Sequence, residues 1–411
     1  MLIERQRVVV TGIGVVTPLG IGKDALWSNV VGGRIAVSRL DRFDTAGYRS
    51  KLAAQVDDFC PGDFLSERRL RWTDRFSQFA VAAARLALED ADFALGGERS
   101  DIGVYLGSAL GGLAYADEQH DVFRARGLDG VRPLLAISVF GGASTCNVSI
   151  EFGLTGPTVA NGNSCASGAV AIGEAFRAIA RGDVRAALAG GVEAPLSPLI
   201  FGAFTVIRAM STRNDDPPAA SRPFDLGRDG FVMGEGSGVL FIERLDDALD
   251  RGAHVYGEIV GFGLTNDAHH MSAPRPDGTV NASAMQRALA EAELAPDAVD
   301  VVNAHGSGTP LGDRSEALAI DQTFAGRAVP VSATKGQHGH ALGATGAWEA
   351  ALSLLTFGHG IVPKTVNHTA ADPDCPIAVT REPLDVAPRI VLSNSAGFGG
   401  INAALVFRRY D

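Results

Sequence analysis

Cysteine is scarce in this chain, and its few cysteines are scattered. Among 411 residues there are only four, Cys60, Cys146, Cys165 and Cys375, and no two of them form a close pair. Disulfide frameworks and zinc knuckles are recognised by closely spaced cysteines. The spacing therefore indicates neither kind of scaffold.

The sequence also lacks long apolar runs and an excess of positive charge. No apolar run is long enough to span a membrane, and the first five residues lead directly into a predicted strand rather than into a signal peptide. We therefore expect a cytoplasmic protein with no membrane partner. The 36 Lys and Arg residues are outnumbered by 47 Asp and Glu residues, and the net charge of −11 argues against general nucleic-acid binding.

Small and apolar residues are plentiful instead. Hydrophobic residues make up 46% of the chain, charged residues make up 20%, and there are 50 glycines, which together indicate a globular protein with a large core. Residues 7–14 and 101–106 have the pattern of strands, and apolar residues repeat every three or four positions in segment 77–89. Strands that alternate with helices indicate a layered α/β fold.

Gly12 and Gly14 follow the first strand with the spacing of a dinucleotide-binding loop. Such a loop needs a third glycine and a continuing helix, and Thr17 and Pro18 stand there instead. We therefore predict no Rossmann-type site at this turn.

Cys165 lies between a predicted strand, residues 157–160, and a predicted helix, residues 169–181. At the start of a helix the unpaired backbone N–H groups and the positive end of the dipole favour a thiolate over a thiol. The thiolate is the nucleophilic form, so this position predicts a reactive cysteine. The alternative is a buried structural cysteine.

The second half of the chain resembles the first half, segment by segment. The matching pairs keep the same order: the opening strand with residues 258–263, residues 85–89 with 287–291, and residues 106–108 with 305–307. Ordered similarity of this kind predicts two α/β halves, residues 1–255 and 256–411.

The helix after Cys165 also has a counterpart. A shift of 175 residues places Gly168 on Gly343 and Cys165 on His340. We therefore expect each half to direct a helix N-terminus toward a shared cleft, one with Cys165 and the other with His340. His305, in a glycine-rich turn after another strand-like run, is expected to join them.

A cysteine with two histidines suits acyl transfer from thioesters. The thiolate takes an acyl group and holds it covalently. Two neutral imidazoles that donate to one carbonyl oxygen stabilise the enolate that forms when a β-carboxyl thioester loses CO2, and each such donor is worth roughly 3 kcal/mol. The alternative for His305 and His340 is a packed or surface histidine, but both lie in glycine-rich turns, where functional side chains gather.

A metal site is the rival interpretation of the histidines. His338 and His340 are two positions apart, and His269 and His270 are adjacent, so these residues have the spacing of ligands. No acidic or cysteine ligand is spaced beside them, and we predict no metal.

The chain resembles the elongating β-ketoacyl-acyl carrier protein synthases of the thiolase-like superfamily over essentially its full length. The matching stretches are residues 163–168, 211–215, 221–225, 229–232, 234–236, 303–306, 310–313, 332–335, 339–340 and 394–402. The resemblance implies a thiolase-like fold with two similar α/β halves in a layered αβαβα arrangement. It also implies a decarboxylative Claisen condensation with a malonyl unit, in fatty-acid or type II polyketide chain elongation. No cofactor is implied, because the phosphopantetheine of an acyl carrier protein carries the substrates.

By resemblance, Cys165 is the acylated nucleophile. His305 and His340 assist decarboxylation of the malonyl unit and hold the thioester oxygen. Lys335 and Glu349 match a charged pair that orders the second histidine and nearby water, although an ordinary ion pair would look the same in the sequence.

The resemblance also implies binding residues around the nucleophile. Its backbone N–H and that of Phe398 form the oxyanion hole, and Phe398 acts as a gate. Ser307 and Thr309 bind the phosphopantetheine arm, and Leu110 and Phe204 line the substrate pocket.

Basic residues are expected to contact the carrier protein. Carriers of these pathways are acidic and so is this chain, so a local positive patch is required. The candidates are Arg68, Arg69, Arg124, Arg126, Arg208 and Arg213; the alternative is that they only solvate the surface. The family is dimeric through the strand before the nucleophile, which implies a homodimer or a heterodimer with a chain-length-factor-like paralogue.

Some positions depart from the common family pattern. They are Ser307-Gly308, the run Gly336-Gln337-His338, and Ala396, which replaces an aromatic residue before the gate. These departures favour a specialised synthase and leave the fatty-acid and polyketide pathways both open.

Two other functions compete with the condensing enzyme. A thiolase-type acyl-CoA enzyme would need another active-site cysteine, and Cys375 has no suitable context. A non-catalytic partner subunit would not need Cys165, His305 and His340, which are all present.

Overall fold

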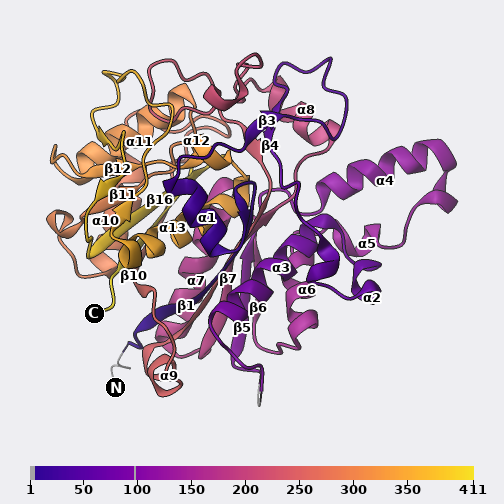
Figure 1. Cartoon of the computed structure of the whole chain (residues 1–411), viewed down its shortest axis with the longest axis horizontal. Coiled ribbons are helices and arrows are strands. Elements are labelled where there is room, and N and C mark those ends of the chain that lie inside the picture. Colours follow the sequence, from indigo (N-terminus) through magenta and orange to yellow (C-terminus); the bar gives the residue numbers. More distant parts are fainter. Residues whose placement is uncertain (1–4, 97–98) are drawn as a thin grey trace.

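One long mixed sheet runs through the molecule (Figure 1). The computed structural model describes residues 5–96 and 99–411, and within these residues the sheet has 12 strands. Their order is β14-β12-β11-β16-β17-β10-β1-β9-β7-β5-β6, and β2 pairs with β1. The bounds are β1 (Val8–Thr17), β2 (Gly20–Ile21), β5 (Ile102–Gly107), β6 (Thr158–Asn161), β7 (Ala186–Glu193), β9 (Gly236–Arg244), β10 (Gly257–Asn266), β11 (Val301–Asn303), β12 (Pro330–Ser332), β14 (Ala378–Val379), β16 (Ile390–Gly397) and β17 (Ile401–Arg408).

The strand order is the same in both halves of the chain. From the centre outward, the first half has β1, β9, β7, β5 and β6, and the second half has β10, β17, β16, β11 and β12. In each half the first two pairings are antiparallel and the next two are parallel. At the centre, β1 and β10 pair antiparallel, with Val8 opposite Ile259. The prediction of two similar α/β halves is confirmed, while their exact limits at residues 255 and 256 stay a prediction.

Helices cover both halves and fill the space between them. α3 packs on β1 and β9, α10 packs on β10 and β17, and α7 and α13 pack against each other in the middle. The three largest apolar cores of the described residues lie around α7 and α13, under α3, and under α10 and α11. This is the predicted αβαβα layering.

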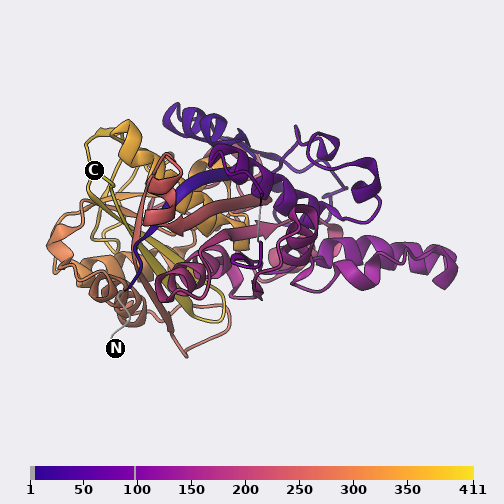
Figure 2. The same ribbon diagram turned by 90° about the horizontal axis from the view of Figure 1, so that it is seen from below.

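One helix, α4, projects from the body of the molecule (Figures 1 and 2). The helices have the following bounds. They are α1 (Lys23–Val31), α2 (Glu67–Leu70), α3 (Arg75–Asp90), α4 (Leu113–Arg126), α5 (Leu135–Ser138), α6 (Ala143–Phe152), α7 (Ser167–Arg181), α8 (Pro198–Val206), α9 (Leu245–Asp250), α10 (Thr279–Glu291), α11 (Pro310–Thr323), α12 (Lys335–His338) and α13 (Thr345–His359). The short strands β3 (Val37–Arg39), β4 (Leu52–Ala54), β8 (Met233–Gly234), β13 (Ile361–Val362) and β15 (Leu384–Asp385) form two small sheets.

Gly12 and Gly14 lie inside β1 and do not form a nucleotide-binding loop. A Cβ on Gly14 would lie 1.9 Å from the carbonyl oxygen of Ala83 in α3. In the second half, a Cβ on Gly263 would lie 1.9 Å from the carbonyl oxygen of Ala284 in α10. The repeated glycines therefore allow a helix to approach a central strand closely in each half.

The predicted register of the helix repeat is wrong by three residues. α13 begins and ends 178 residues after α7, and the turns before them, η3 (Ser164–Ala166) and η6 (Leu342–Ala344), share this spacing. Each turn starts with a left-handed residue, at φ 52° for Ser164 and 43° for Leu342. Cys165 therefore corresponds to Gly343, and His340 lies just before the matching turn.

No helix in the described part of the chain is both long and apolar enough to cross a membrane. Residues 1–4, to which the expected absence of a signal peptide refers, lie outside the described residues.

Candidate active site

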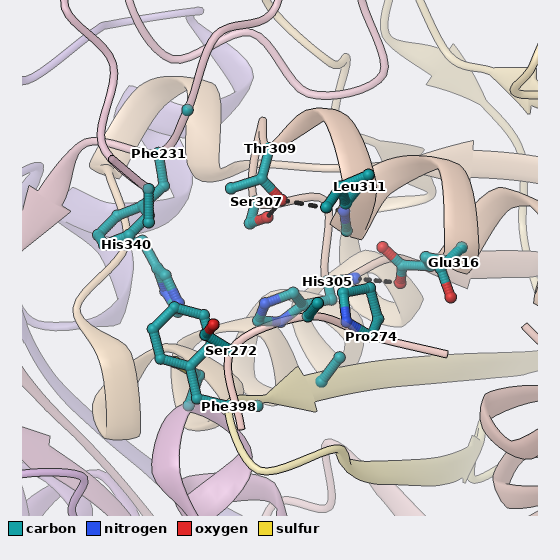
Figure 3. Close-up of a pocket in the computed structure, with 18 of the residues that line it drawn as sticks. Phe231, Ser272, Pro274, His305, Ser307, Thr309, Leu311, Glu316, His340 and Phe398 are labelled. Atoms are coloured by element: carbon teal, nitrogen blue, oxygen red, sulfur yellow. Dashed lines mark hydrogen bonds between the residues drawn. The ribbon is translucent and has the colours of Figure 1, made fainter. Parts of the chain in front are cut away.

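Residues from both halves of the chain line a cavity of about 420 Å³. Cys165 comes from the first half, and His305, His340 and Phe398 come from the second. Figure 3 shows both imidazoles and the ring of Phe398 in the same space. The structure thus brings together the cysteine and the two histidines that the sequence places in different segments.

A strained turn presents Cys165 at the start of α7. The preceding Ser164 has φ 52°, a conformation that costs on the order of 1–3 kcal/mol for a residue with a side chain. The hydroxyl of Ser167 holds the turn by donating to the carbonyl oxygen of Ser164 at 2.7 Å. The thiol that results is 7% exposed and faces the cavity.

Burial controls the protonation of this thiol. It raises the pKa of Cys165 to about 11, and the charge of Glu193 acts in the same direction. The hydroxyl of Ser164, the ammonium of Lys335 and the backbone N–H of Phe398 lower the pKa, but by less. The prediction that the helix N-terminus makes Cys165 a thiolate is therefore wrong, because the thiol form dominates at neutral pH.

Lys335 fixes the tautomer of His305. Its ammonium lies 3.4 Å from Nδ1 of His305 and also donates to the carbonyl oxygen of the same residue. An ammonium has only donors, so Nδ1 must accept and the ring proton sits on Nε2. Burial, the charge of Lys335 and the neighbouring His340 hold the pKa of His305 well below its usual value.

A backbone hydrogen bond and one side-chain contact hold His340 in place. Its N–H donates to the carbonyl oxygen of Val232 at 2.7 Å, and its Nδ1 lies 3.2 Å from Oγ1 of Thr345. Phe231 packs on the ring edge to face at 5.4 Å. Burial and the charge of Lys335 lower the pKa of His340 well below its usual value, so both imidazoles are neutral.

Lys335 and Glu349 form a fully buried ion pair. The distance from Nζ to Oε1 is 2.5 Å, and both side chains are 0% exposed. Burial raises the pKa of Glu349 to about 7, although the ammonium acts in the opposite direction. Lys335 thus connects Glu349 to His305.

Aromatic rings close one side of the cavity. Phe398 follows β16 and stacks on Phe204 of α8 at 6.3 Å, and Phe204 meets Phe231 edge to face at 6.1 Å. Phe398 is only partly buried. Leu110 belongs to the apolar cluster that contains Cys165, so the predicted pocket residues Leu110 and Phe204 both lie near the nucleophile.

Ser307 and Thr309 line the same cavity from the loop before α11. Their hydroxyl oxygens are 2.9 Å apart, and Thr309 caps α11 by accepting from the N–H of Gly312. Figure 3 shows them on the wall of the cavity between His340 and Leu311.

Comparisons with known proteins agree with this geometry. The family model described as β-ketoacyl synthase, N-terminal domain, matches residues 5–248, and the model of the C-terminal domain matches residues 256–369. The chain belongs to the β-ketoacyl synthase family. It is a condensing acyltransferase.

Named relatives of this synthase match it over nearly its whole length. The 3-oxoacyl-[acyl-carrier-protein] synthase 2 of Staphylococcus aureus (strain N315) is 41% identical over 99% of both chains. The ishigamide ketosynthase/chain length factor structure superposes with a TM-score of 0.93 at 34% identity and covers 99% of this chain and 100% of that chain. A type II polyketide synthase ketosynthase, solved with its acyl-carrier protein and bound to the hexaketide, gives a TM-score of 0.90 at 32% identity with the same coverage. The thiolase-like fold is thereby shown.

The six predicted carrier-contact arginines of the synthase lie in different surroundings. Arg208 lines the mouth of the cavity, and Arg68 is exposed on α2. Arg124 and Arg126 lie in the last turn of the projecting α4. The remaining two, Arg69 and Arg213, are engaged in internal contacts.

Arg69 binds Glu151 at 3.0 Å and Oδ1 of Asn147 at 2.9 Å. Arg213 donates to the carbonyl oxygen of Gly227 at 3.0 Å. These contacts connect residues far apart in the sequence, so charge clustering alone did not reveal them.

Glu316 is a site residue that the sequence analysis missed. Its carboxylate lines the cavity and accepts from the backbone N–H groups of His305 and Gly306, each at 2.7 Å, and from Asn394 at 2.7 Å. Burial raises its pKa. A carboxylate in the sequence of α11 gives no sign that it holds a turn ten and eleven residues upstream.

The rival metal site finds no support in the geometry. Nδ1 of His338 lies 2.8 Å from the carbonyl oxygen of Gly339, and its Nε2 lies 2.9 Å from the hydroxyl of Thr334. His269 and His270 are exposed. Within residues 5–96 and 99–411, no group of three or more His, Cys, Asp or Glu residues is arranged to hold a metal ion.

Proposed function

We propose that the synthase extends an acyl chain held as a thioester on Cys165. The thiol sulfur attacks the acyl thioester, its proton goes to the departing carrier thiol, and the backbone N–H groups of Cys165 and Phe398 stabilise the oxyanion. A malonyl thioester then enters, with its carbonyl oxygen bound by Nε2–H of His305 and of His340. Loss of CO2 leaves the electron pair as an enolate, whose carbon attacks the acyl group and releases the Cys165 sulfur as a thiolate, which takes up a proton to restore the thiol.

The observation that carries this proposal is the pair of neutral imidazoles. The rings of His305 and His340 meet edge to face, with centroids 5.2 Å apart, and lie on the same cavity as Cys165. Neutral N–H donors stabilise an enolate oxygen, and each donor of this kind contributes roughly 3 kcal/mol to the transition state. A metal or redox group has no step to perform in this sequence, so we propose that no cofactor is needed beyond the carrier's phosphopantetheine.

An acyl carrier protein is the proposed partner at the cavity mouth. Ser307 and Thr309 line the cavity and are placed to hydrogen bond a phosphopantetheine arm. Of the predicted carrier-contact arginines, Arg68, Arg124, Arg126 and Arg208 are exposed, and Arg208 lines the cavity. Exposed apolar side chains stand at or beside the mouth: Val206 (75% exposed), Ile207 (51%), Met271 (77%) and Leu311 (63%). A carrier that delivers its arm through this mouth must cover them, so we propose that apolar contacts and Arg208 together hold it.

A dimer through β6 is the proposed assembly. β6 is the edge strand of the long sheet and pairs only with β5 among the described strands. Exposed apolar residues lie on and near it, including Val159, Ile150, Phe140 and Ile137. An unpaired strand edge beside such residues is suited to pairing with another chain, either a second copy or a paralogue of the chain-length-factor type. The cytoplasmic location expected from the sequence stays a prediction.

Mass spectrometry tests the proposal directly. After the synthase is mixed with acyl-carrier protein, the acyl mass should appear on Cys165, and Cys165→Ala should remain unmodified. Labelled malonyl-carrier protein should then release CO2, and His305→Ala and His340→Ala should each slow this release by about 100-fold or more. Wild-type protein that takes up no acyl group of any length would refute the enzymatic role. Acylation without CO2 release would favour the thiolase-type alternative.

A further inference from the structure

Glu193, the last residue of β7, is 0% exposed and accepts four hydrogen bonds. Its Oε1 accepts from the hydroxyl of Ser108 at 3.0 Å and from the N–H of Leu110 at 3.1 Å. Its Oε2 accepts from the N–H of Ala109 at 2.8 Å and from the N–H of Gly343 at 3.1 Å. One carboxylate therefore joins the turn after β5 to turn η6 of the other half.

The backbones around this carboxylate are in close contact. A Cβ on Gly343 would lie 2.9 Å from Oε2 of Glu193 and 2.8 Å from the backbone nitrogen of Ala109. A Cβ on Gly191 would lie 2.2 Å from the carbonyl oxygen of Gly343. Because neither turn has free space at this junction, the position of the carboxylate determines the position of both turns.

Each of the two turns contributes a leucine to the apolar cluster around the nucleophile. Leu110 follows Ser108 in the first turn, Leu342 precedes Gly343 in the second, and both pack in the cluster that contains Cys165. Leu342 also has φ 43°, a strained conformation that persists only where its surroundings hold it. An acyl chain bonded to Cys165 must lie among these side chains.

We propose that Glu193 is a positioning residue that sets the width of the acyl pocket by holding the turns of Leu110 and Leu342 in fixed register beside Cys165. This inference rests on the proposed role of Cys165 as the acyl acceptor. It assigns chain-length selection to a carboxylate that no substrate touches, in addition to the pocket side chains themselves.

The same carboxylate acts on the nucleophile through its charge. The side chains whose charge acts on the Cys165 thiol are Glu193 and Lys335, and the titratable His305, His340 and Glu316 line the same cavity as the thiol. Glu193 raises the pKa of the thiol and Lys335 lowers it, while the two imidazoles are neutral. Replacing Glu193 by a neutral residue should therefore lower the thiol pKa, an effect that a purely structural role would not produce.

The test uses Glu193→Gln, which keeps the shape and removes the charge and one acceptor. Acylation of Cys165 by carrier proteins with a series of chain lengths is followed by mass spectrometry, and alkylation of Cys165 is followed against pH. We expect the preference between neighbouring chain lengths to shift toward longer chains by about tenfold, the discrimination that one methylene gives in an apolar pocket. The alkylation profile should move to lower pH.

Two further variants make the outcome decisive. Ser108→Ala removes a single bond to Glu193 and should shift the chain-length preference in the same direction, so it answers the question if Glu193→Gln does not fold. Glu243→Gln is the matched control, because Glu243 is also a buried carboxylate at a strand, but it binds Thr11 and Arg251 instead of the turns of Leu110 and Leu342. Unchanged chain-length and pH profiles in Glu193→Gln, or equal changes in Glu243→Gln, would overturn the inference. Failure of the wild type to become acylated would instead refute the proposed function.

Discussion

Nζ of Lys335 lies 3.4 Å from Nδ1 of His305. This contact determines which nitrogen of the imidazole carries the proton, because an ammonium cannot accept a hydrogen bond. His305 can therefore act only as an Nε2–H donor toward the cavity while Lys335 is charged. A buried ammonium needs a counter-charge, and Glu349 supplies it at 2.5 Å.

Removing the Lys335 charge should lower both the stability of the protein and the rate of CO2 release, and a second substitution should restore only the stability. In Lys335→Met, Glu349 stays buried without a partner, and we expect a loss of about 3–5 kcal/mol in the free energy of unfolding. In Lys335→Met with Glu349→Gln, both charges are gone and most of this stability should return. CO2 release from malonyl-carrier protein should remain about 100-fold low in both variants, because the tautomer of His305 is no longer fixed. Urea unfolding and CO2 release are measured for both variants. If the double variant released CO2 at the rate of the wild type, this role of Lys335 would be contradicted.

The buried His338 should make stability depend on pH in a defined direction. Burial lowers its folded-state pKa to about 3, compared with 6.5 in the unfolded chain. As the pH falls below about 6.5, the unfolded chain takes up the proton first, so the wild type loses stability until the folded-state pKa is reached. Lowering the pH from 7.5 to 4.5 should cost about 2.6 kcal/mol through this residue alone.

The measurement for His338 is a difference between two proteins. Urea unfolding is followed across this pH range in the wild type and in His338→Gln, which does not titrate. Contributions of the other groups cancel in the comparison. The free energy of unfolding of the wild type, relative to that of His338→Gln, should therefore fall on acidification by the amount above. A difference that is independent of pH would show that His338 is not buried in its neutral form.

Local pattern was sufficient to predict the fold and the central residues of the site. Alternating strands and helices, ordered similarity between the halves, and family motifs are enough to place Cys165, His305 and His340 together from the sequence alone. The three-residue error in the helix repeat arose because alanine and glycine match at several shifts. The true register is set by the turns at Ser164 and Leu342, whose left-handed backbone is not visible in their residue types.

Properties that depend on packing could not be predicted in the same way. A helix N-terminus favours a thiolate, but burial of Cys165 outweighs it and raises the thiol pKa. The sequence suggests that Arg69 is a free basic residue, but in the folded chain it forms an ion pair with Glu151. Glu193 binds the backbone N–H of Gly343, which is distant in the sequence, and Glu316 binds that of His305 in a turn before its own helix. Both roles depend on tertiary structure.

The edge strand β6 leads to a prediction about assembly. Val159 is 42% exposed on this strand, and Val159→Glu would place a buried, unpaired charge in a dimer interface formed there. We expect this variant to sediment as a monomer at concentrations where the wild type is a dimer. Leu384→Glu is the control, because Leu384 has a similar exposure of 38% on the remote strand β15. A dimer that persists in Val159→Glu would remove β6 from the interface.

The apolar residues at the cavity mouth lead to a prediction about the carrier protein. Val206→Glu should raise KM for carrier-bound substrates by about tenfold, equivalent to about 1.4 kcal/mol, because a charge on this 75% exposed side chain opposes burial under an acidic partner. Alkylation of Cys165 by a small reagent should not change, since Val206 does not line the cavity. Leu249→Glu, with 49% exposure on the distant α9, is the control for added negative charge. If Arg68→Glu raises KM and Val206→Glu does not, the carrier is held by the basic residues and not by the apolar mouth.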